Sequence, residues 1–119
     1  MAIRDITEGE LKLAVSDYLQ FAQNQGKLYF DRLNSGDFIE VRGKTRRRVT
    51  GCRKGTADFF VLTKYKCGLW IPRIIFLELK SPRGRLTPEQ GAFKKMVEEQ
   101  LAEYEIIRSI EDLEKVLDL

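Results

Sequence analysis

Two short apolar runs place the strongest constraint on how this chain folds. They are DFFVLT, which begins at Asp58, and RIIFLELK, which begins at Arg73. In both runs large apolar residues stand at odd and at even positions, a pattern typical of strands buried on both faces. Such strands lie in the middle of a sheet that helices cover. We therefore expect two central strands, over residues 57–63 and 73–80.

Three helical patterns supply the covering layers. Thr7 and Glu10 form a capping box, and apolar residues at helical spacing follow it, which predicts a helix over residues 8–24. Thr87, followed by Pro88, starts a second helix. Apolar residues from position 110 to 117 have the spacing of a third. Further strands are expected over residues 27–33, 38–41 and 104–108, with a tight turn at 34–37. A chain of 119 residues with 43% hydrophobic composition is then expected to form a single α/β domain, residues 1–119.

The two central strands form a hairpin whose centre is marked by Gly68. If the pairing is symmetric about Gly68, Asp58 lies directly opposite Glu78 on the same face of the sheet. Lys80 stands two residues after Glu78, so its side chain points to that face as well. The prediction depends on the register, because a slip by an odd number of residues near Pro72 moves Asp58 to the opposite face.

Two neighbouring carboxylates at the end of buried strands repel each other and lose hydration, unless a cation binds between them. Mg²⁺ or Mn²⁺ suits such a site, because these ions take a few oxygen ligands and keep several waters. Lys80 beside the metal would orient or deprotonate an attacking water. The alternative is that Glu78 and Lys80 form an ordinary ion pair at a strand end.

The composition excludes several other chemistries. The chain contains no histidine, which rules out an imidazole base and a zinc site with histidine ligands. Two cysteines, Cys52 and Cys67, are too few for a zinc site made of thiolates alone, and we expect both to be reduced. No apolar segment approaches the ~18 residues of a membrane span, so we expect no membrane association and a cytoplasmic protein.

Charge is distributed unevenly along the chain. Residues 42–97 carry 15 basic and 3 acidic groups, whereas residues 98–119 carry 2 basic and 8 acidic groups. The segment from 42 to 54 contains no acidic residue and seven basic ones, which are Arg42, Lys44, Arg46, Arg47, Arg48, Arg53 and Lys54. Such a segment, whether a loop or a short ribbon, favours nucleic acid as the partner. The alternative is a solvated basic loop that binds nothing.

The ordered set of motifs resembles the VRR-NUC family of the PD-(D/E)xK nuclease superfamily, in its small stand-alone form from phages and bacteria. The resemblance rests on Gly55 to Asp58, the strand after it, Glu78-Leu79-Lys80, Gly84 to Thr87, and Gln90. It covers residues 7 to 113. It implies a restriction-endonuclease-like fold, in which helices flank a central mixed β-sheet.

The resemblance also implies roles for individual residues. Asp58 and Glu78 would bind the metal, helped by the Leu79 carbonyl, and Lys80 would act on the water. A glutamate of the first helix belongs at the site. We favour Glu8 over Glu10, because Glu8 precedes the inward-facing Leu11 and Val15 by three and seven residues. Gln90 would assist catalysis, although Thr87 and Gln90 also form a capping box.

The function expected on these grounds is metal-dependent endonucleolytic cleavage of DNA, selective for structures such as a four-way junction and carried out by a homodimer. The basic segment would hold the nucleic-acid backbone without reading bases. One alternative is a nucleic-acid-binding module without catalysis. Another is an interaction protein whose acidic C-terminal third docks a basic partner.

Overall fold

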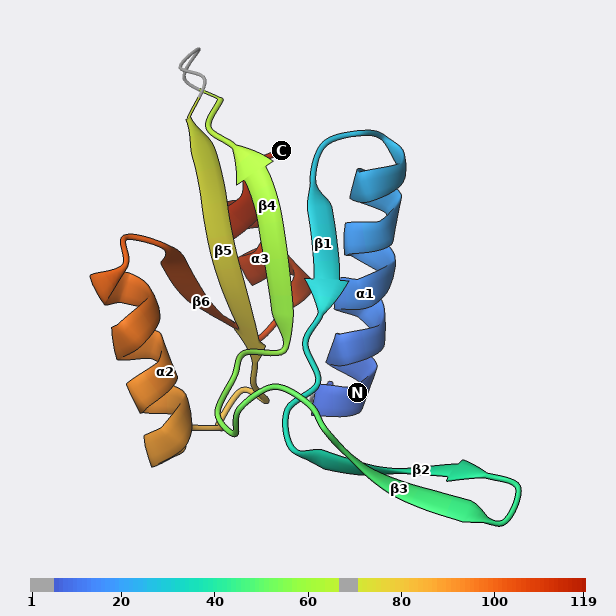
Figure 1. The fold of residues 1–119 in the computed structure, drawn as a ribbon. Helices are drawn as coiled ribbons and strands as arrows, with labels where there is room; N and C mark the ends of the chain where they lie inside the picture. The colour runs from blue at the N-terminus through green and yellow to red at the C-terminus, as the bar shows by residue number, and fades with distance from the viewer. Residues whose placement is uncertain (1–5, 67–70) are drawn as a thin grey trace, which may run out of the picture.

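The computed structural model describes residues 6–66 and 71–119 (Figure 1). The elements are α1 (Glu8–Asn24), β1 (Tyr29–Arg32), β2 (Asp37–Arg42), β3 (Thr45–Thr50), β4 (Phe59–Lys64), β5 (Pro72–Leu79), α2 (Pro88–Glu99), β6 (Glu103–Ile107) and α3 (Ile110–Leu117). Each predicted helix is present, and α1 and α2 both begin with the expected capping boxes. The strand expected over residues 27–33 is shorter, because only four of its residues pair with β4.

Four strands form a mixed sheet in the order β1-β4-β5-β6. β4 is antiparallel to both of its neighbours, whereas β6 runs parallel to β5 and is reached through α2. The two apolar runs are therefore the central strands, as predicted. The expectation of a mixed sheet flanked by helices is confirmed.

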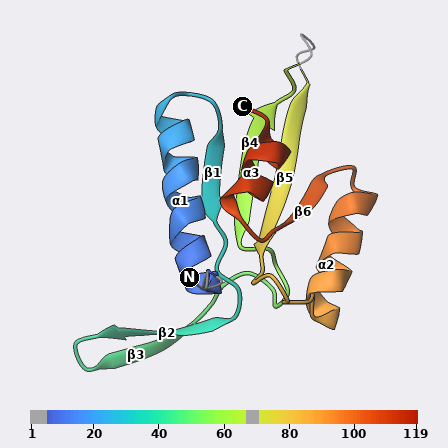
Figure 2. The ribbon, with the colours of Figure 1, turned by 180° about the vertical axis from the view of Figure 1, so that it is seen from behind.

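The helices cover the two faces of this sheet unequally (Figures 1 and 2). On one face, α1 and α3 bury a core that includes Leu11, Val15, Phe59, Leu77 and Leu113, each of them fully inaccessible to solvent. On the other face, α2 packs beside β6 and covers a smaller cluster around Val97 and Tyr104.

The prediction that both central strands are buried on both faces is wrong for their hairpin end. Leu62 of β4 is 40% exposed and Ile74 of β5 is 42% exposed, and the two residues are paired across the strands. The reason is that α2 lies along β6 and does not extend over β4 (Figure 1). Apolar residues at both odd and even positions indicate that a strand can be buried on both faces. They do not indicate how far along the strand the covering helix extends.

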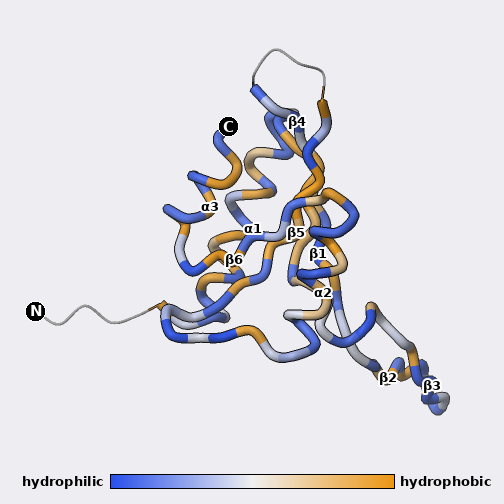
Figure 3. Tube along the Cα trace, turned by 90° about the vertical axis from the view of Figure 1, so that its left-hand side faces the viewer, coloured by the Kyte–Doolittle hydropathy of each residue, from blue (hydrophilic) through white to orange (hydrophobic). Residues whose placement is uncertain are grey.

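The tight turn expected at residues 34–37 does not join two paired strands. β1 pairs with β4, and β2 instead pairs with β3 in a separate two-stranded sheet. This sheet, which we call the ribbon, comprises Asp37–Arg42 and Thr45–Thr50 and projects from the rest of the chain (Figures 1 and 3).

Two other expectations concern the state of the cysteines and membrane-spanning segments. Cys52 is a free cysteine, and Cys67, like the hairpin centre Gly68, lies outside the described residues. Among the helices that the structure describes, none combines the length and the apolar character that crossing a membrane requires.

Candidate active site

Asp58 and Glu78 lie side by side where β4 begins and β5 ends. Phe59 is the first paired residue of β4, opposite Leu77, and Asp58 directly precedes it, next to the residue that follows Leu77 in β5. The Asp58 N–H also donates to the Leu77 carbonyl at 3.0 Å. The register predicted from symmetry about Gly68 is confirmed for the pairs from Phe59 with Leu77 to Lys64 with Pro72. Asp58 lies one residue before these pairs, and its N–H bonds to the carbonyl opposite Phe59, so it departs from the regular ladder.

The Asp58 carboxylate is held by two different groups. Its Oδ2 accepts a hydrogen bond of 2.8 Å from the Leu79 N–H, and its Oδ1 lies 3.5 Å from Nζ of Lys12. The first contact fixes the carboxylate against the end of β5. The second brings an ammonium group from α1 to the site.

The Glu78 side chain is buried, with only 3% of the residue exposed. Its Oε1 accepts a hydrogen bond of 2.9 Å from Nε2 of Gln90 and lies 3.7 Å from Nζ of Lys80. Its Oε2 is buried and has no hydrogen-bond partner. A buried oxygen without a partner costs about 1–3 kcal/mol, so this atom marks a position where a ligand would be stabilised.

The pKa of Glu78 is raised from its ordinary value of 4.5 to about 7. Burial is the largest cause, and the negative charges of Asp58 and Glu8 act in the same direction, while Lys80 and Lys12 partly oppose the increase. Glu78 is therefore partly protonated near neutral pH. A divalent cation between the two carboxylates would displace this proton, because metal ligands must be ionised.

The first helix offers the two glutamates that the sequence left as candidates. Glu8 lies close enough to Glu78 to affect its pKa. Glu10 closes the capping box, in which the Thr7 N–H donates to Oε2 of Glu10 and the Glu10 N–H donates to the Thr7 hydroxyl. The geometry thus favours Glu8 as the α1 carboxylate of the site.

Gln90 closes the predicted capping box and also contacts the acidic site. Its Oε1 accepts a hydrogen bond of 2.9 Å from the Thr87 N–H, which completes the capping box of α2. Its Nε2 donates to Glu78 at the same time. Because an amide has a donor end and an acceptor end, one side chain ties the start of α2 to the buried carboxylate.

Two residues near the acidic pair were not predicted. Lys12 stands four residues after Glu8, which is about one helical turn. Once Glu8 is assigned to the site, this spacing predicts that Lys12 lies on the same side of the helix. Tyr104 of β6 has a buried hydroxyl without a hydrogen-bond partner. Burial and the charges of Glu78 and Asp58 raise its pKa well above the ordinary value. No local sequence signal places Tyr104 near these carboxylates, because its position depends on the parallel pairing of β6 with β5.

The oxygen donors at this site suit a hard divalent cation. Among the residues that the structure describes, no three Cys, Asp or Glu side chains come together as a metal-binding group. The site offers Asp58, Glu78 and the main chain at Leu79, and Mg²⁺ and Mn²⁺ complete such incomplete sets with water. The Oε2 of Glu78 without a hydrogen-bond partner and the raised pKa of this carboxyl both fit the binding of a cation.

The basic segment is divided between the ribbon and the loop that leads to Asp58. Acidic residues just before the segment neutralise much of it, since Asp37 pairs with Arg48, and Glu40 pairs with Arg42 and Arg47. Lys54 lies 3.6 Å from Glu89. Within the described part of the chain, three of the seven cations have no acidic partner within 4 Å: Lys44, Arg46 and Arg53. The sequence of residues 42–54 contains no acidic residue. In the folded chain, pairing of β2 with β3 brings acidic residues of β2 next to the arginines.

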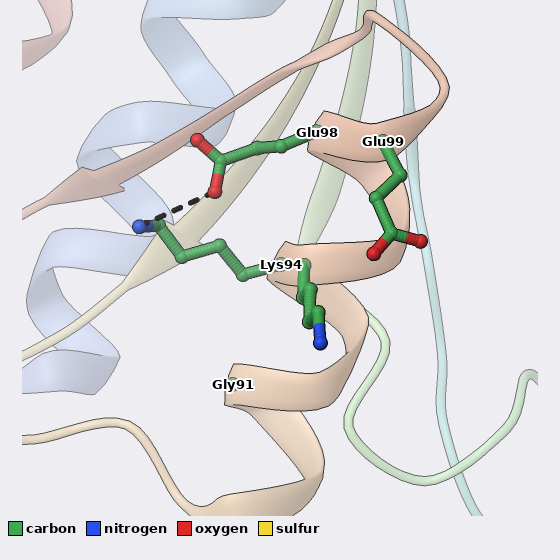
Figure 4. A pocket seen from close by; sticks show the side chains of 5 residues that line it. Gly91, Lys94, Glu98 and Glu99 are labelled. Atoms are coloured by element: carbon green, nitrogen blue, oxygen red, sulfur yellow. Dashed lines mark ion pairs between the residues drawn. The ribbon is translucent and has the colours of Figure 1, made fainter.

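A shallow hollow elsewhere on α2 contains none of the site residues (Figure 4). It is lined by Gly91, Lys94, Lys95, Glu98 and Glu99, and Lys94 pairs with Glu98 one turn later at 3.4 Å. Its charges are balanced within one helix, which is typical of a solvated helix surface. The acidic pair at the strand ends is therefore the stronger candidate.

Comparison with known proteins does not assign the chain to a family. No protein-family model matches the chain, and no curated protein matches it significantly.

Proposed function

We propose that the chain is a divalent-metal-dependent endonuclease of the VRR-NUC type, with a restriction-endonuclease-like fold, that hydrolyses phosphodiester bonds of DNA. The observation that carries the proposal is the proximity of two carboxylates: Asp58 is held by the Leu79 N–H next to the buried Glu78, and one Glu78 oxygen lacks a hydrogen-bond partner. Lys80 stands two residues after Glu78 and lies 3.7 Å from its carboxylate.

In this proposal Asp58, Glu78 and the Leu79 carbonyl hold Mg²⁺ or Mn²⁺. The ion supplies charge stabilisation at the phosphate and lowers the pKa of a bound water. Lys80 orients the attacking water from the side of Glu78. Gln90 keeps the Glu78 carboxylate in place, since its amide donates to Oε1 and leaves Oε2 available. Glu8 adds negative charge to the site from α1.

Hydrolysis then needs one water and no further reactant. The water oxygen forms a bond to phosphorus while the bond from phosphorus to the leaving oxygen breaks. The water loses a proton and the leaving oxygen gains one, so charge and atoms balance. The preferred substrate is a branched DNA such as a four-way junction, and paired cuts on a junction suit a homodimer.

The first experiment compares cleavage of a labelled four-way junction, a flap, a DNA duplex and an RNA duplex in Mg²⁺, Mn²⁺ or EDTA. Lys80→Ala and Asp58→Asn are expected to lose cleavage while keeping DNA binding. Lys94→Ala is the matched control, because its ion pair lies on the outer surface of α2.

Three outcomes would contradict parts of the proposal. Binding without cleavage in every metal would favour a binding module without catalysis. Equal rates on junction, flap and duplex would refute selectivity for branched DNA. A monomeric mass in sedimentation, with and without the junction, would refute the homodimer.

A further inference from the structure

The ribbon exposes apolar side chains that the rest of the described chain does not cover. Ile39 is 70% exposed and Val41 is 61% exposed. β2 and β3 pair only with each other. A two-stranded sheet on its own is marginally stable in water, so its open faces favour an interaction surface.

The register assigns these residues to one face of the ribbon. Ile39 is paired with Arg48, and Val41 is paired with Arg46. Directly opposite residues share a face, so aliphatic and guanidinium groups alternate there. We call this surface, made of Ile39, Val41, Arg46 and Arg48, the aliphatic-arginine face.

The opposite face has a different character. There Glu40 is bridged by Arg42 and Arg47, so its charges are largely neutralised. On the aliphatic-arginine face, Arg48 pairs with Asp37 at the base of the ribbon, while Arg46 has no acidic partner within 4 Å among the described residues. The unpaired positive charge therefore lies beside the exposed aliphatic groups.

We propose that the aliphatic-arginine face lies in a groove of duplex DNA. A groove offers phosphates along its edges and apolar sugar and base edges inside, which matches alternating arginine and aliphatic side chains. The major groove of B-form DNA is wide enough for a two-stranded ribbon, whereas that of an RNA duplex is too deep and narrow for side chains to read. This inference rests on the proposed function and adds the surface that holds the substrate.

The base of the ribbon is attached directly to the candidate active site. The Leu33 N–H donates to the Asp58 carbonyl at 2.9 Å, and the Cys52 N–H donates to the Asn34 carbonyl at 2.7 Å. The ribbon thus starts at the strand end that carries the acidic pair (Figure 1). Strands of six residues extend ~20 Å, so a ribbon in the groove covers about six base pairs to one side of the cleaved bond.

The test combines binding to a DNA duplex with footprinting on a four-way junction, both in EDTA. The double variant Ile39→Ser with Val41→Ser leaves every charge in place, and Leu13→Ser is the control, because Leu13 on α1 is also 70% exposed. The double variant is expected to bind DNA at least about five-fold more weakly with an unchanged salt dependence, since only apolar contacts are lost. Arg46→Gln should weaken binding and lower the salt slope by about one.

Hydroxyl-radical footprints on the junction are expected to show protection of about six base pairs beside the bond that is cut in Mg²⁺, which the double variant loses and the control keeps. Unchanged binding and footprint in the double variant would overturn the inference, as would equal binding to an RNA duplex. Conversion of a dimer to a monomer by the double variant, without loss of the footprint, would assign the face to a second copy instead. If the wild-type protein neither binds nor cuts DNA, the proposed function fails. If the wild-type protein cuts DNA and the double variant binds and protects DNA in the same way, the groove inference fails and the proposed function stands.

Discussion

The buried Glu78 carboxyl is predicted to make the folding stability of this protein fall as pH rises from about 4.5 to 7. Its pKa is about 7 in the folded protein, against an ordinary value of 4.5. Between these pH values the folded state binds a proton that the unfolded state has already lost. The contribution of Glu78 to stability is therefore fully present below pH 4.5 and disappears as pH rises through 7.

The size of the effect follows from the pKa difference. One pKa unit corresponds to about 1.4 kcal/mol, so the free energy of unfolding should decrease by up to about 3 kcal/mol over this range. The chain contains no histidine, so few other groups titrate between pH 5 and 8. Urea unfolding in EDTA at closely spaced pH values measures the decrease directly.

Glu78→Gln is the control that isolates this carboxyl. The variant keeps an acceptor for the Gln90 amide and carries no ionisable group, so its stability should depend less on pH. At pH 8 it should be more stable than the wild type by up to about 3 kcal/mol, although it loses metal binding. Stability that rises with pH in the wild type, or an equally steep fall in Glu78→Gln, would refute the reasoning.

Three further predictions concern single contacts. Lys12→Met should raise Mn²⁺ affinity about five-fold in calorimetric titration, because its ammonium 3.5 Å from Asp58 no longer competes with the metal; unchanged affinity would contradict this. Arg73→Met should reduce stability to urea by about 3 kcal/mol, since it leaves Glu103 without its two hydrogen bonds and frees the end of α3. Gly55→Ala should lower the melting temperature, because φ is +92° there and the added Cβ would lie 2.5 Å from a carbonyl of α2; an unchanged melting temperature would refute that strain.

Local rules made much of the acidic site predictable. A hairpin that is symmetric about its turn fixes the register of β4 and β5, and the alternation of side chains places Glu78 and Lys80 on one face, where they lie 3.7 Å apart. Asp58 lies just before the paired residues, and its hydrogen bond to the Leu79 N–H holds it at the site. The observed pairing of Phe59 with Leu77 follows that symmetry. The two capping boxes are local in the same way, since each one involves residues three positions apart.

The remaining features depend on packing between distant segments. Lys12 lies near Asp58 only because the first turns of α1 pack near the start of β4, and the Tyr104 side chain lies within range of the charges of Glu78 and Asp58 only because β6 pairs with β5. The sequence also could not show that α2 stops short of Leu62. The part of the sheet that α2 covers depends on where this helix packs, and no residue pattern in the sequence indicates that position.

The hydrogen bonds at the base of the ribbon also have a consequence for how the chain folds. β1 pairs with β4 across an intervening segment, so forming this pair carries the entropy cost of closing a long loop. The ribbon is a local hairpin, which forms within about 1–10 μs, and it brings Asn34 next to Cys52. Once the hairpin exists, most of the loop is already closed. A shortened chain in which a glycine turn joins residues 34 and 52 is therefore expected to fold at a similar rate, with the sheet intact.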